Sequence, residues 1–431
     1  MTIQRRRFLR SMGKAAGALV ALGPGALGRV QAAAREVAGK TPEEAAHDED
    51  FWLAVRRSFS LDPKHVSFNA GAWNPSPRAV QEALIRNLEF VNAAPLDHMP
   101  AVLGPYKETL RGRLARHAGC SAEEIAFTRN TTEALNTAIF GIDLKPGDEV
   151  LTTDQDYGSM LHAWHQRARR EGIVVKEVSI PSPPPRIEDL ADVIERAITP
   201  RTRVIMVCHV VDPTGQIFPV QQICQLARRR DIRVIVDGAL SFGCIPVDLH
   251  AMGCDYFGTS LHKGMYAPLG TGFLYVRKER IGSLWPLYGA ADPRGGDIRK
   301  FESIGTHPVA PIAAIGQALD FHEEIGAERK RARLHFLKRR LLDRIAGVPG
   351  VRLHTSPDPG QSCGIANIAI EGIDPKALRM HLYSAHRLNV WWIEHKDCRG
   401  IWVSPHLFTR IQDVDALGEV VEKVALGGLP S

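Results

Sequence analysis

Cysteine pairs, long apolar runs and repeats are all missing from this 431-residue chain. Its seven cysteines are scattered and include no Cys-X-X-Cys pair, which excludes the common zinc sites and gives no disulfide framework. Most of them fit small core residues. No stretch is long and apolar enough to span a membrane, and no repeat or low-complexity tract interrupts the chain. With 44% hydrophobic and 24% charged residues, the composition is that of a globular protein.

Although the formal net charge is +6, most of the chain has no excess of basic over acidic residues. Six of the 54 lysines and arginines lie in residues 1–34, which hold no acid, and the remaining 48 balance the 48 acidic residues. A nucleic-acid-binding domain carries its positive charge on the folded part. The charge pattern therefore excludes a nucleic-acid partner and assigns the basicity to the N-terminal segment.

That segment, "QRRRFLRSMGKAAGALVALGPGALGRVQAAA", has a charged start, a mildly apolar middle and a small-residue end at Ala32–Ala34. This is the layout of a secretory signal. Arg5 and Arg6, followed by Phe8, resemble the twin-arginine signal, whose export machinery carries folded proteins. We predict a signal peptide over residues 1–34, a periplasmic or secreted protein, and no membrane span after signal removal.

The rest of the chain divides by pattern into three parts. Residues 35–64 read as a helical segment. Residues 65–311 alternate seven short β-branched runs with helical stretches, which predicts a large α/β domain with a mainly parallel seven-stranded sheet between helices. Residues 312–431 begin with one long helical stretch and predict a smaller C-terminal α+β domain. The basic run in that helix is interpreted as a solvated face.

Chemically active side chains follow the predicted strands. Ligands of open α/β sheets bind at the carboxyl ends of strands, and the candidates there are Thr131, Thr132, Tyr157, Asp212, Asp237, Ser260, His262 and Lys263. Taken singly, each also fits a structural role such as a helix cap or a partnered buried acid. Together they supply phosphate-binding hydroxyls, a buried acid, an aromatic platform and an amine, the groups that a phosphorylated aldehyde cofactor with a ring nitrogen needs. No metal ligand set is predicted.

From about residue 65 to the C-terminus the sequence resembles the class V, fold-type I enzymes that use pyridoxal 5′-phosphate. This family includes cysteine desulfurases and isopenicillin N epimerase-like proteins. The most specific part is "VDGALSFGCIPVDLHAMGCDYFGTSLHKGMYAPLGTGFLYVR", in which Asp237 and Lys263 stand 26 residues apart as the family requires. With an export signal in front, the layout is similar to that of the exported class V enzyme of pyoverdine maturation.

The resemblance implies a role for each candidate. Lys263 would form the Schiff base with the cofactor and move protons at the substrate carbon. Asp237 would pair with the ring nitrogen, Tyr157 would stack on the ring, and Asp212 would lie near the ring hydroxyl. The phosphate would be held by Thr131, Thr132, Ser260 and His262. The segment "ESIGTHP" implies that Gly305 and Thr306 contact the phosphate of a neighbouring subunit, and hence a homodimer with shared sites.

Several positions depart from the family pattern. Leu240 stands where relatives often place a hydrogen-bonding residue, and Trp391 and Trp402 stand where relatives carry arginines that bind a substrate carboxylate. Tryptophan cannot bind a carboxylate, so the two residues indicate a substrate whose carboxylate is absent or masked, unless Arg399 or Arg410 substitutes. They also fit simple packing of the smaller domain.

We therefore expect an exported enzyme that acts at an amino-bearing carbon of a small molecule or peptide, by transamination or related chemistry. Three alternatives stay open: an epimerase or lyase acting on a free amino acid, a cysteine desulfurase, and a non-catalytic cofactor-binding protein. The desulfurase would need a mobile nucleophilic cysteine. Cys398 lies in a comparable region, but "EHKDCRG" does not match the family's cysteine loop.

Overall fold

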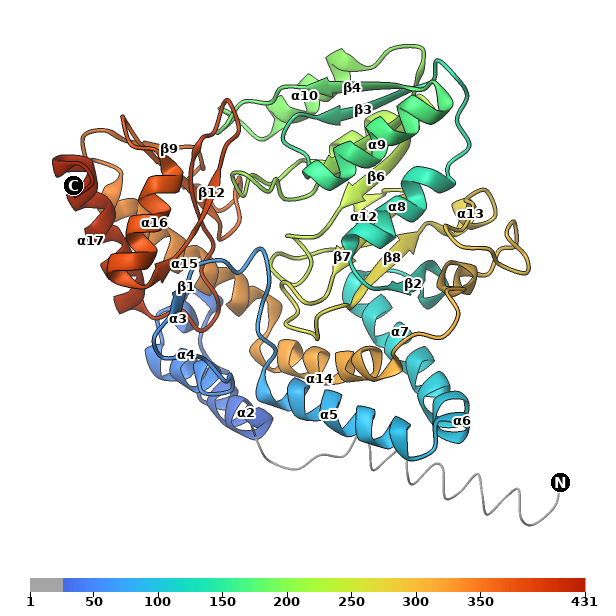
Figure 1. The fold of residues 1–431 in the computed structure, drawn as a ribbon, viewed down its shortest axis with the longest axis horizontal. Coiled ribbons are helices and arrows are strands. Elements are labelled where there is room, and N and C mark those ends of the chain that lie inside the picture. Colours follow the sequence, from blue (N-terminus) through green and yellow to red (C-terminus); the bar gives the residue numbers. More distant parts are fainter. Residues whose placement is uncertain (1–25, 431) are drawn as a thin grey trace.

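The computed structural model describes residues 26–430 and shows two domains, each built around a β-sheet (Figure 1). The helices are α2 (Ala26–Glu36), α3 (Pro42–Ala46), α4 (Glu49–Arg56), α5 (Arg78–Ala93), α6 (Pro95–His98), η1 (Met99–Leu103), α7 (Gly104–Ala118), η2 (Ala122–Glu124), α8 (Thr131–Gly141), α9 (Gly158–Glu171), α10 (Glu188–Ala197), α11 (Val220–Arg228), α12 (Leu249–Met252), α13 (Lys278–Ile281), η3 (Ile298–Glu302), α14 (Val309–Ile325), α15 (Ala327–Ile345), α16 (Pro375–His386) and α17 (Ile411–Gly427). The strands are β1 (Val66–Ser67), β2 (Ile125–Thr128), β3 (Glu149–Thr153), β4 (Val174–Val178), β5 (Thr202–Cys208), β6 (Arg233–Asp237), β7 (Tyr256–Ser260), β8 (Gly272–Val276), β9 (Val351–Leu353), β10 (Ala366–Ile370), β11 (Leu388–Asn389), β12 (Trp391–Ile393) and β13 (Gly400–Val403).

The large domain holds a seven-stranded sheet in the order β2-β8-β7-β6-β5-β3-β4, with β8 antiparallel to both of its neighbours and the other pairs parallel. Its central strands read as unbroken apolar runs because helices cover both faces. One face packs on α5, α7, α10, α11 and α14, and the other on α8 and α9. All seven predicted strands form, and the prediction of a mainly parallel seven-stranded sheet is confirmed.

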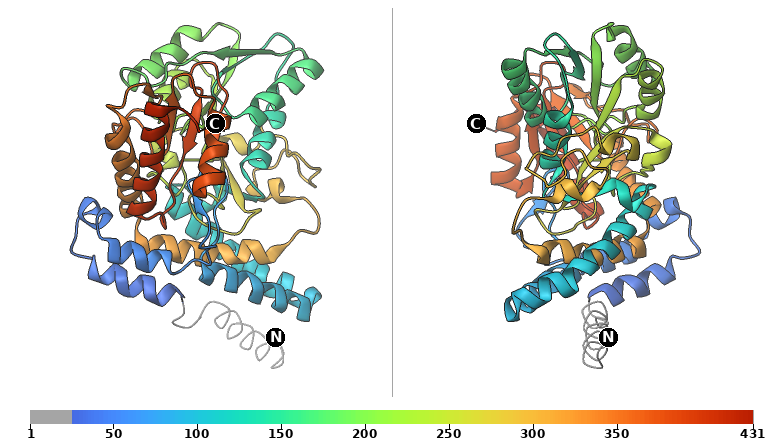
Figure 2. Two further views of the ribbon diagram at one scale, coloured as in Figure 1. Left: turned by 60° about the vertical axis from the view of Figure 1, so that its left-hand side comes forward. Right: turned by 90° about the vertical axis from the view of Figure 1, so that its right-hand side faces the viewer.

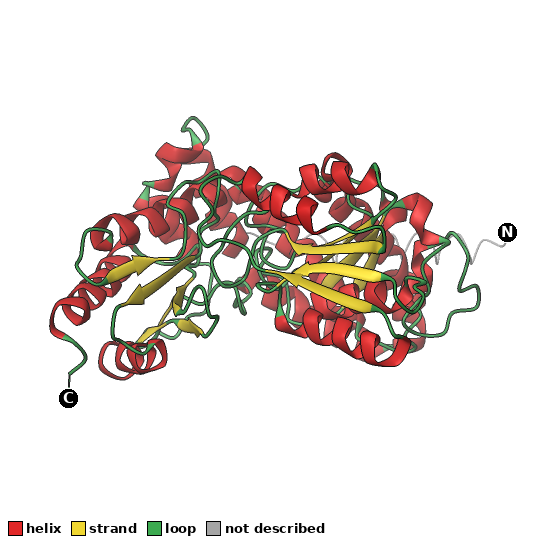
Figure 3. Ribbon diagram, turned by 90° about the horizontal axis from the view of Figure 1, so that it is seen from above, coloured by secondary structure: helices red, strands yellow, loops and turns green. Residues whose placement is uncertain are grey.

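The smaller domain is a four-stranded antiparallel sheet, β12-β13-β10-β9, covered by α15, α16 and α17. Figure 3 shows the two sheets apart, with loops between them. The predicted single long helix is broken: Gly326, with a φ of 87°, separates α14 from α15. Since α14 packs on α5 and α7, the change of domain falls at Gly326 and not at residue 312.

Two further features differ from the sequence interpretation. The predicted solvated face of α15 is wrong in part, because Lys330, Arg333 and Lys338 are at most 1% exposed. Their charged ends donate to the carbonyl oxygens of Gly264, Ala46 and Ser356. Strand β1 pairs in parallel with β11, so the chain after the N-terminal helices contacts the smaller domain first.

The N-terminal helices lie at one end of the molecule. Helix α2 packs on α4 and α14, and Val30 is fully buried there. Figure 2 shows α2–α4 alongside α5 and α14. The twin-arginine motif lies outside the described residues. The expected end of the signal, Ala32–Ala34, lies within α2, and Ala33 and Ala34 are 8% exposed. No helix among residues 26–430 has the length and apolar character that a membrane span requires.

Candidate active site

A cavity of about 360 Å³ opens where the carboxyl ends of the large sheet face the smaller domain. Side chains from the ends of β5, β6 and β7, from the N-terminus of α8 and from β12 and β13 line it together with the loop before α5. The cavity thus lies at the edge of the sheet where parallel strands end and helices begin, as expected for a ligand site in this architecture.

Lys263 lies in the turn that follows β7, and its side chain lines the cavity. Its backbone carbonyl accepts hydrogen bonds from Nδ2 of Asn74 at 2.7 Å and from the backbone N–H of Tyr266 at 3.1 Å. Tyr266 has a φ of 57°, in the left-handed region that residues other than glycine rarely adopt. The turn that carries the amine is therefore held in one conformation by groups far apart in the sequence.

Hydroxyl groups gather at the N-terminus of α8. Oγ1 of Thr131 lies 2.7 Å from Oγ of Ser260, and the backbone N–H of Thr131 donates to the same oxygen at 2.9 Å. Thr132 lines the cavity beside them. Gly272 permits this approach, because a Cβ there would lie 2.5 Å from the carbonyl oxygen of Thr259. Hydroxyls at a helix N-terminus form a site suited to a phosphate group.

Asp237 ends β6 and is 3% exposed. Its Oδ1 accepts the backbone N–H of Ala239 at 2.9 Å. Burial raises the pKa of Asp237 to about 6, while the Ala239 hydrogen bond and the Lys263 charge act in the opposite direction. A carboxyl group withdrawn from water in this way gains most from a cationic partner, such as a protonated ring nitrogen.

Tyr157 immediately precedes α9 and remains 48% exposed at the cavity. The buried carboxylate of Asp156 fixes its position. Oδ2 of Asp156 accepts the Thr152 hydroxyl at 2.5 Å and the backbone N–H of Thr153 at 2.8 Å, and Oδ1 accepts the backbone N–H of Cys208 at 2.8 Å. Asp156 thus ties the end of β3 to the end of β5, and the aromatic ring follows directly.

An apolar wall closes the side of the cavity toward the smaller domain. Trp402 is 3% exposed, and its indole Nε1 donates to the carbonyl oxygen of Asp212 at 2.7 Å. A Cβ on Gly71 would lie 2.2 Å from the Trp402 ring and 3.1 Å from Leu240, so Gly71 leaves the space that both side chains fill. Trp391 is the partner of Trp402 across β12 and β13, which places both rings on one face of the sheet.

No arginine is among the described residues that line the cavity. Arg399 pairs at the surface with Glu394 and Asp374, and Arg410 pairs with Asp413. Arg399 and Arg410, the two candidates for binding a substrate carboxylate, therefore do not line the cavity. Withdrawal from water raises the pKa of Asp212, with the charge of Lys263 opposing this. Among the described residues that line the cavity, Lys263 is the only lysine or arginine.

A polar cluster joins the two domains near the cavity. Oδ2 of Asp154, one residue after β3, receives the ammonium of Lys396 at 3.1 Å and the Ser179 hydroxyl at 2.5 Å. His395 and Asp397 approach the same carboxylate closely enough to form a group that could hold a metal ion. The Lys396 ammonium already forms an ion pair with Asp154. We therefore interpret this cluster as a link between the β12–β13 hairpin and the large domain.

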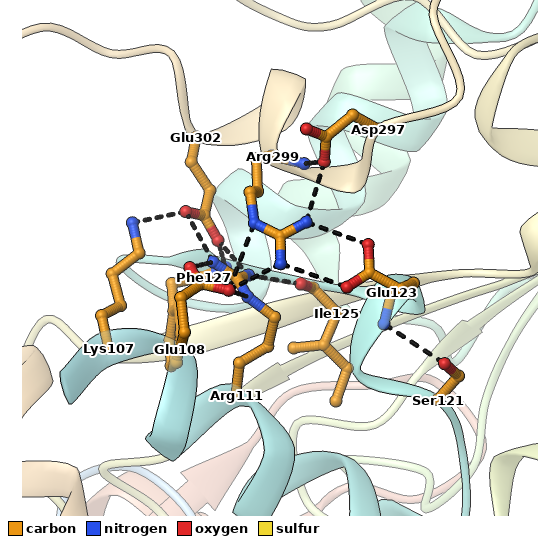
Figure 4. Close-up of polar contacts among 10 residues, drawn as sticks. All are labelled: Lys107, Glu108, Arg111, Ser121, Glu123, Ile125, Phe127, Asp297, Arg299 and Glu302. Carbon is orange, nitrogen blue, oxygen red and sulfur yellow. Dashed lines mark hydrogen bonds and ion pairs between the residues drawn. The ribbon is translucent and has the colours of Figure 1, made fainter. Parts of the chain in front are cut away.

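The structure brings eight of the nine predicted site residues to one cavity: Thr131, Thr132, Tyr157, Asp212, Asp237, Ser260, His262 and Lys263. Thr306 does not line it and lies in an exposed loop after η3. Figure 4 shows how the base of that loop is anchored. The Glu302 carboxylate accepts from Arg111 at 2.5 Å and from the backbone N–H of Phe127 at 2.7 Å, and pairs with Lys107 at 2.5 Å.

Sequence reasoning missed the residues that support the site. Gly71 and Asn74 belong to the loop "FNAGAWNPSP". Its composition predicts a turn, but it does not predict that Asn74 contacts Lys263. A single acid after a strand usually faces solvent, so the position of Asp156 beside Tyr157 does not by itself indicate a buried support. The signal that could have found it is its place between two threonines and an aromatic residue at a strand end.

Pyridoxal 5′-phosphate fits these groups. The hydroxyls at α8 match its phosphate, the buried Asp237 matches its ring nitrogen, and Lys263 matches its aldehyde. Nδ1 of His262 is buried and has no hydrogen-bond partner among the described residues, which leaves it free for a ligand at this end of the cavity.

Comparison with known proteins agrees with the geometry. Residues 73–390 match the aminotransferase class-V family. The chain is 31% identical to an isopenicillin N epimerase of Amycolatopsis lactamdurans, over 87% of this chain and 98% of the relative. It is 30% identical to a probable cysteine desulfurase of Halalkalibacterium halodurans, over 70% and 78%.

Among solved structures, a C-DES mutant with glycine covalently linked to its PLP cofactor matches with a TM-score of 0.75 at 22% identity, over 85% of this chain and 98% of the other. This likeness shows a shared fold. The chain belongs to the class V aminotransferase family of fold-type I enzymes, whose cofactor is pyridoxal 5′-phosphate.

Proposed function

We propose that this enzyme acts at an amino-bearing carbon of a substrate whose α-carboxylate is absent or masked, such as a peptide or a secondary metabolite, by transamination or related chemistry. The observation that carries the proposal is the cavity wall. Trp391 and Trp402 line it, Arg399 and Arg410 are engaged elsewhere, and no arginine lines it among the described residues.

The chain's own groups divide the work of such a reaction. When bound, the cofactor supplies an electron sink for the substrate carbon. Lys263 would hold the cofactor at its aldehyde end, and its amine would move a proton at the substrate carbon. Asp237 would keep a proton on the ring nitrogen, and the hydroxyls of Thr131 and Ser260 would hold the phosphate. Leu240 and Trp402 would exclude water from the side of the cavity that they line.

Paired ligands test this specificity. The purified protein, loaded with pyridoxal 5′-phosphate, is titrated with free amino acids and with the matching amino acid amides, and the visible absorption spectrum is followed. We expect spectral changes at much lower concentrations of the amides. A response to the free acids alone would overturn the proposal and favour an epimerase or lyase on a free amino acid, the alternative that the 31% identical epimerase supports.

Cys398 weakens the desulfurase alternative. It is fully buried, and burial raises its pKa to about 12. A persulfide carrier needs an accessible thiolate. We expect Cys398→Ala to leave the amine response unchanged. Sulfide release from free cysteine by the wild type that is lost in Cys398→Ala would instead favour the desulfurase. A protein that binds the cofactor but responds to no amine would fit the non-catalytic alternative.

A homodimer with shared sites is a further part of the proposal. Large apolar side chains remain exposed next to the site and along α5 and α6: Trp73 at 66%, Ile85 at 56%, Leu88 at 53% and Leu96 at 91%. Such a surface favours a partner, and the exposed Thr306 is available to it. Sedimentation should give a dimer. Mixing inactive Lys263→Ala and Thr306→Ala subunits should restore part of the activity, because the hybrid contains one intact site.

Export through the twin-arginine route is also proposed, on the strength of the leader alone. We expect cell fractionation to find the protein outside the cytoplasm. Replacement of Arg5 and Arg6 by lysine should retain it inside, and normal export of that variant would count against the route.

A further inference from the structure

Lys330 is a buried cation that the proposed chemistry has not used. It lies in the first turn of α15 and is 1% exposed. Its Nζ donates to the carbonyl oxygen of Gly264 at 2.6 Å and to Nδ1 of His322 at 2.7 Å. Among residues 26–430 no carboxylate forms an ion pair with it. A buried ammonium without an acid is costly, and burial lowers the pKa of Lys330 to about 8.

The surroundings of Lys330 keep it in the role of donor. Nδ1 of His322 can accept only when the imidazole is neutral. Burial lowers the pKa of His322 well below its usual value, with the Lys330 charge and His117 acting in the same direction. Burial also lowers the pKa of His117, whose ring centre lies 4.5 Å from that of His322, to about 4. The Cys244 thiol and the Tyr266 ring complete the surroundings.

The carbonyl that Lys330 binds belongs to the residue after Lys263. That peptide is tightly enclosed, since a Cβ on Gly264 would lie 2.4 Å from the carbonyl oxygen of Phe242. Asn74 holds the preceding carbonyl, as described above. Lys330 and Lys263 also line one small cavity of about 30 Å³. Successive carbonyls of the turn are thus held by donors from two regions of the chain, and the donor from the smaller domain is Lys330.

We propose that Lys330 is a positioning residue for the reaction: through the Gly264 carbonyl it fixes the turn that presents Lys263 and ties that turn to the first helix of the smaller domain. The proposal rests on the proposed function for the role of Lys263 as the residue that binds the cofactor.

Lys338 provides a matched control for the test. It lies on the same helix, is 1% exposed, and donates to the hydroxyl of Ser362 at 2.5 Å, away from the Lys263 turn. Burial lowers its pKa to about 8 as well. Lys330→Met and Lys338→Met therefore remove equivalent buried charges, and only the first removes a contact with the turn.

Two measurements compare these variants. Amide hydrogen exchange of residues 261–267 is followed in the protein without added cofactor. After loading with pyridoxal 5′-phosphate, visible circular dichroism reports how rigidly the cofactor is oriented. We expect Lys330→Met to speed exchange in the turn about tenfold or more, as for the loss of one charge-assisted hydrogen bond, and to weaken the circular dichroism. Lys338→Met should lower the melting temperature similarly but leave both signals unchanged.

The outcomes separate the two proposals. Equal effects of the two variants, or an unchanged turn in Lys330→Met, would overturn the positioning role even if the wild type binds the cofactor normally. A wild type that shows no visible band with the cofactor would overturn the proposed function, while the exchange data would still decide whether Lys330 holds the turn. If the methionine variants do not fold, Lys330→Gln and Lys338→Gln replace them. Lys330→Gln keeps a hydrogen-bond donor but loses the charge. Faster exchange of the turn in Lys330→Gln, by a smaller factor than expected for Lys330→Met, with no change in Lys338→Gln, would support the role. The same exchange rate of the turn in both glutamine variants would overturn it.

Discussion

The carboxyl groups of Asp156 and Asp212 lie close enough to Asp237 for their charges to raise its pKa, and the charge of Lys263 lowers it. The Asp156 carboxylate accepts from four donors, two of them on Thr153. Asp237 has the backbone N–H of Ala239 and is otherwise enclosed. At the scale of single residues, the fold therefore buries an acid whose ionised form is poorly solvated and destabilising, as functional sites commonly do.

The raised pKa of Asp237 predicts a pH dependence. The folded protein holds the Asp237 proton up to about pH 6, whereas the ordinary value is 3.8. Stability from this group is thus present below the ordinary value and is lost as pH rises through the folded-state pKa, by about 3 kcal/mol in all. In denaturant unfolding without cofactor, the wild type should lose stability relative to Asp237→Asn between about pH 4 and pH 7. Parallel curves for the two proteins would contradict this.

Gly71 offers a second prediction at the same scale. Gly71→Ala should lower the free energy of unfolding by about 1–3 kcal/mol, because its Cβ would overlap the Trp402 ring. The cost should largely disappear when Trp402 is replaced by alanine, as a double-mutant cycle would show. Gly39→Ala is the control, since nothing lies within 4 Å of its added Cβ. A cost of the same size in both backgrounds would mean that the ring does not set it.

Among the structural elements, η3 combines a network of ion pairs with two apolar side chains, Ile298 and Phe301, that are buried in the core. Glu302 forms ion pairs with Arg111 and Lys107 and accepts a hydrogen bond from a backbone N–H of β2 (Figure 4). Arg299 forms ion pairs with Glu108 and Glu123. The Glu302 side chain is 7% exposed, so its partners would be left without an acid if it were neutralised. The loop that carries Thr306 begins directly after this anchor.

We expect Glu302→Gln to lower the free energy of unfolding by about 3 kcal/mol, the range for breaking a buried ion pair. It should also weaken subunit association measured by sedimentation. Glu123→Gln is the matched control. Its side chain is 55% exposed, and an exposed pair contributes less than about 1 kcal/mol. Similar effects of the two variants would show that burial of the network does not matter.

The sequence predicted the strands and helices better than the tertiary contacts between them. β-branched runs located all seven large-sheet strands, and strand ends brought eight site residues together, because parallel strands end at one edge. The break at Gly326 was missed, since a glycine inside a helical pattern is often tolerated. The burial of Lys330 and the reach of Asn74 to Lys263 depend on tertiary packing, which local patterns do not encode.

At the scale of the whole molecule, α2 bears on the predicted processing. Deletion of residues 1–34 removes Val30, Ala33 and Ala34 from a shared core with α4 and α14, whereas deletion of residues 1–25 keeps them. We expect the longer deletion to lower the free energy of unfolding by about 3 kcal/mol relative to the shorter one, from lost apolar burial. Equal melting temperatures would show that α2 is dispensable and would remove any structural objection to cleavage after Ala34.

The pairing of β1 with β11 has a consequence for the order in which the protein is made. The chain contributes Val66 and Phe68 to the smaller domain, leaves to build the large one, and reaches the strand that pairs with β1 only at Leu388, 322 residues after Val66. On the ribosome, the large domain is complete before the last strands and α17 emerge. Until then the core that Phe68 enters is incomplete, because α17 and β13 contribute to it. The smaller domain, and with it the wall that carries Trp391 and Trp402, is therefore the last part of the active site to exist.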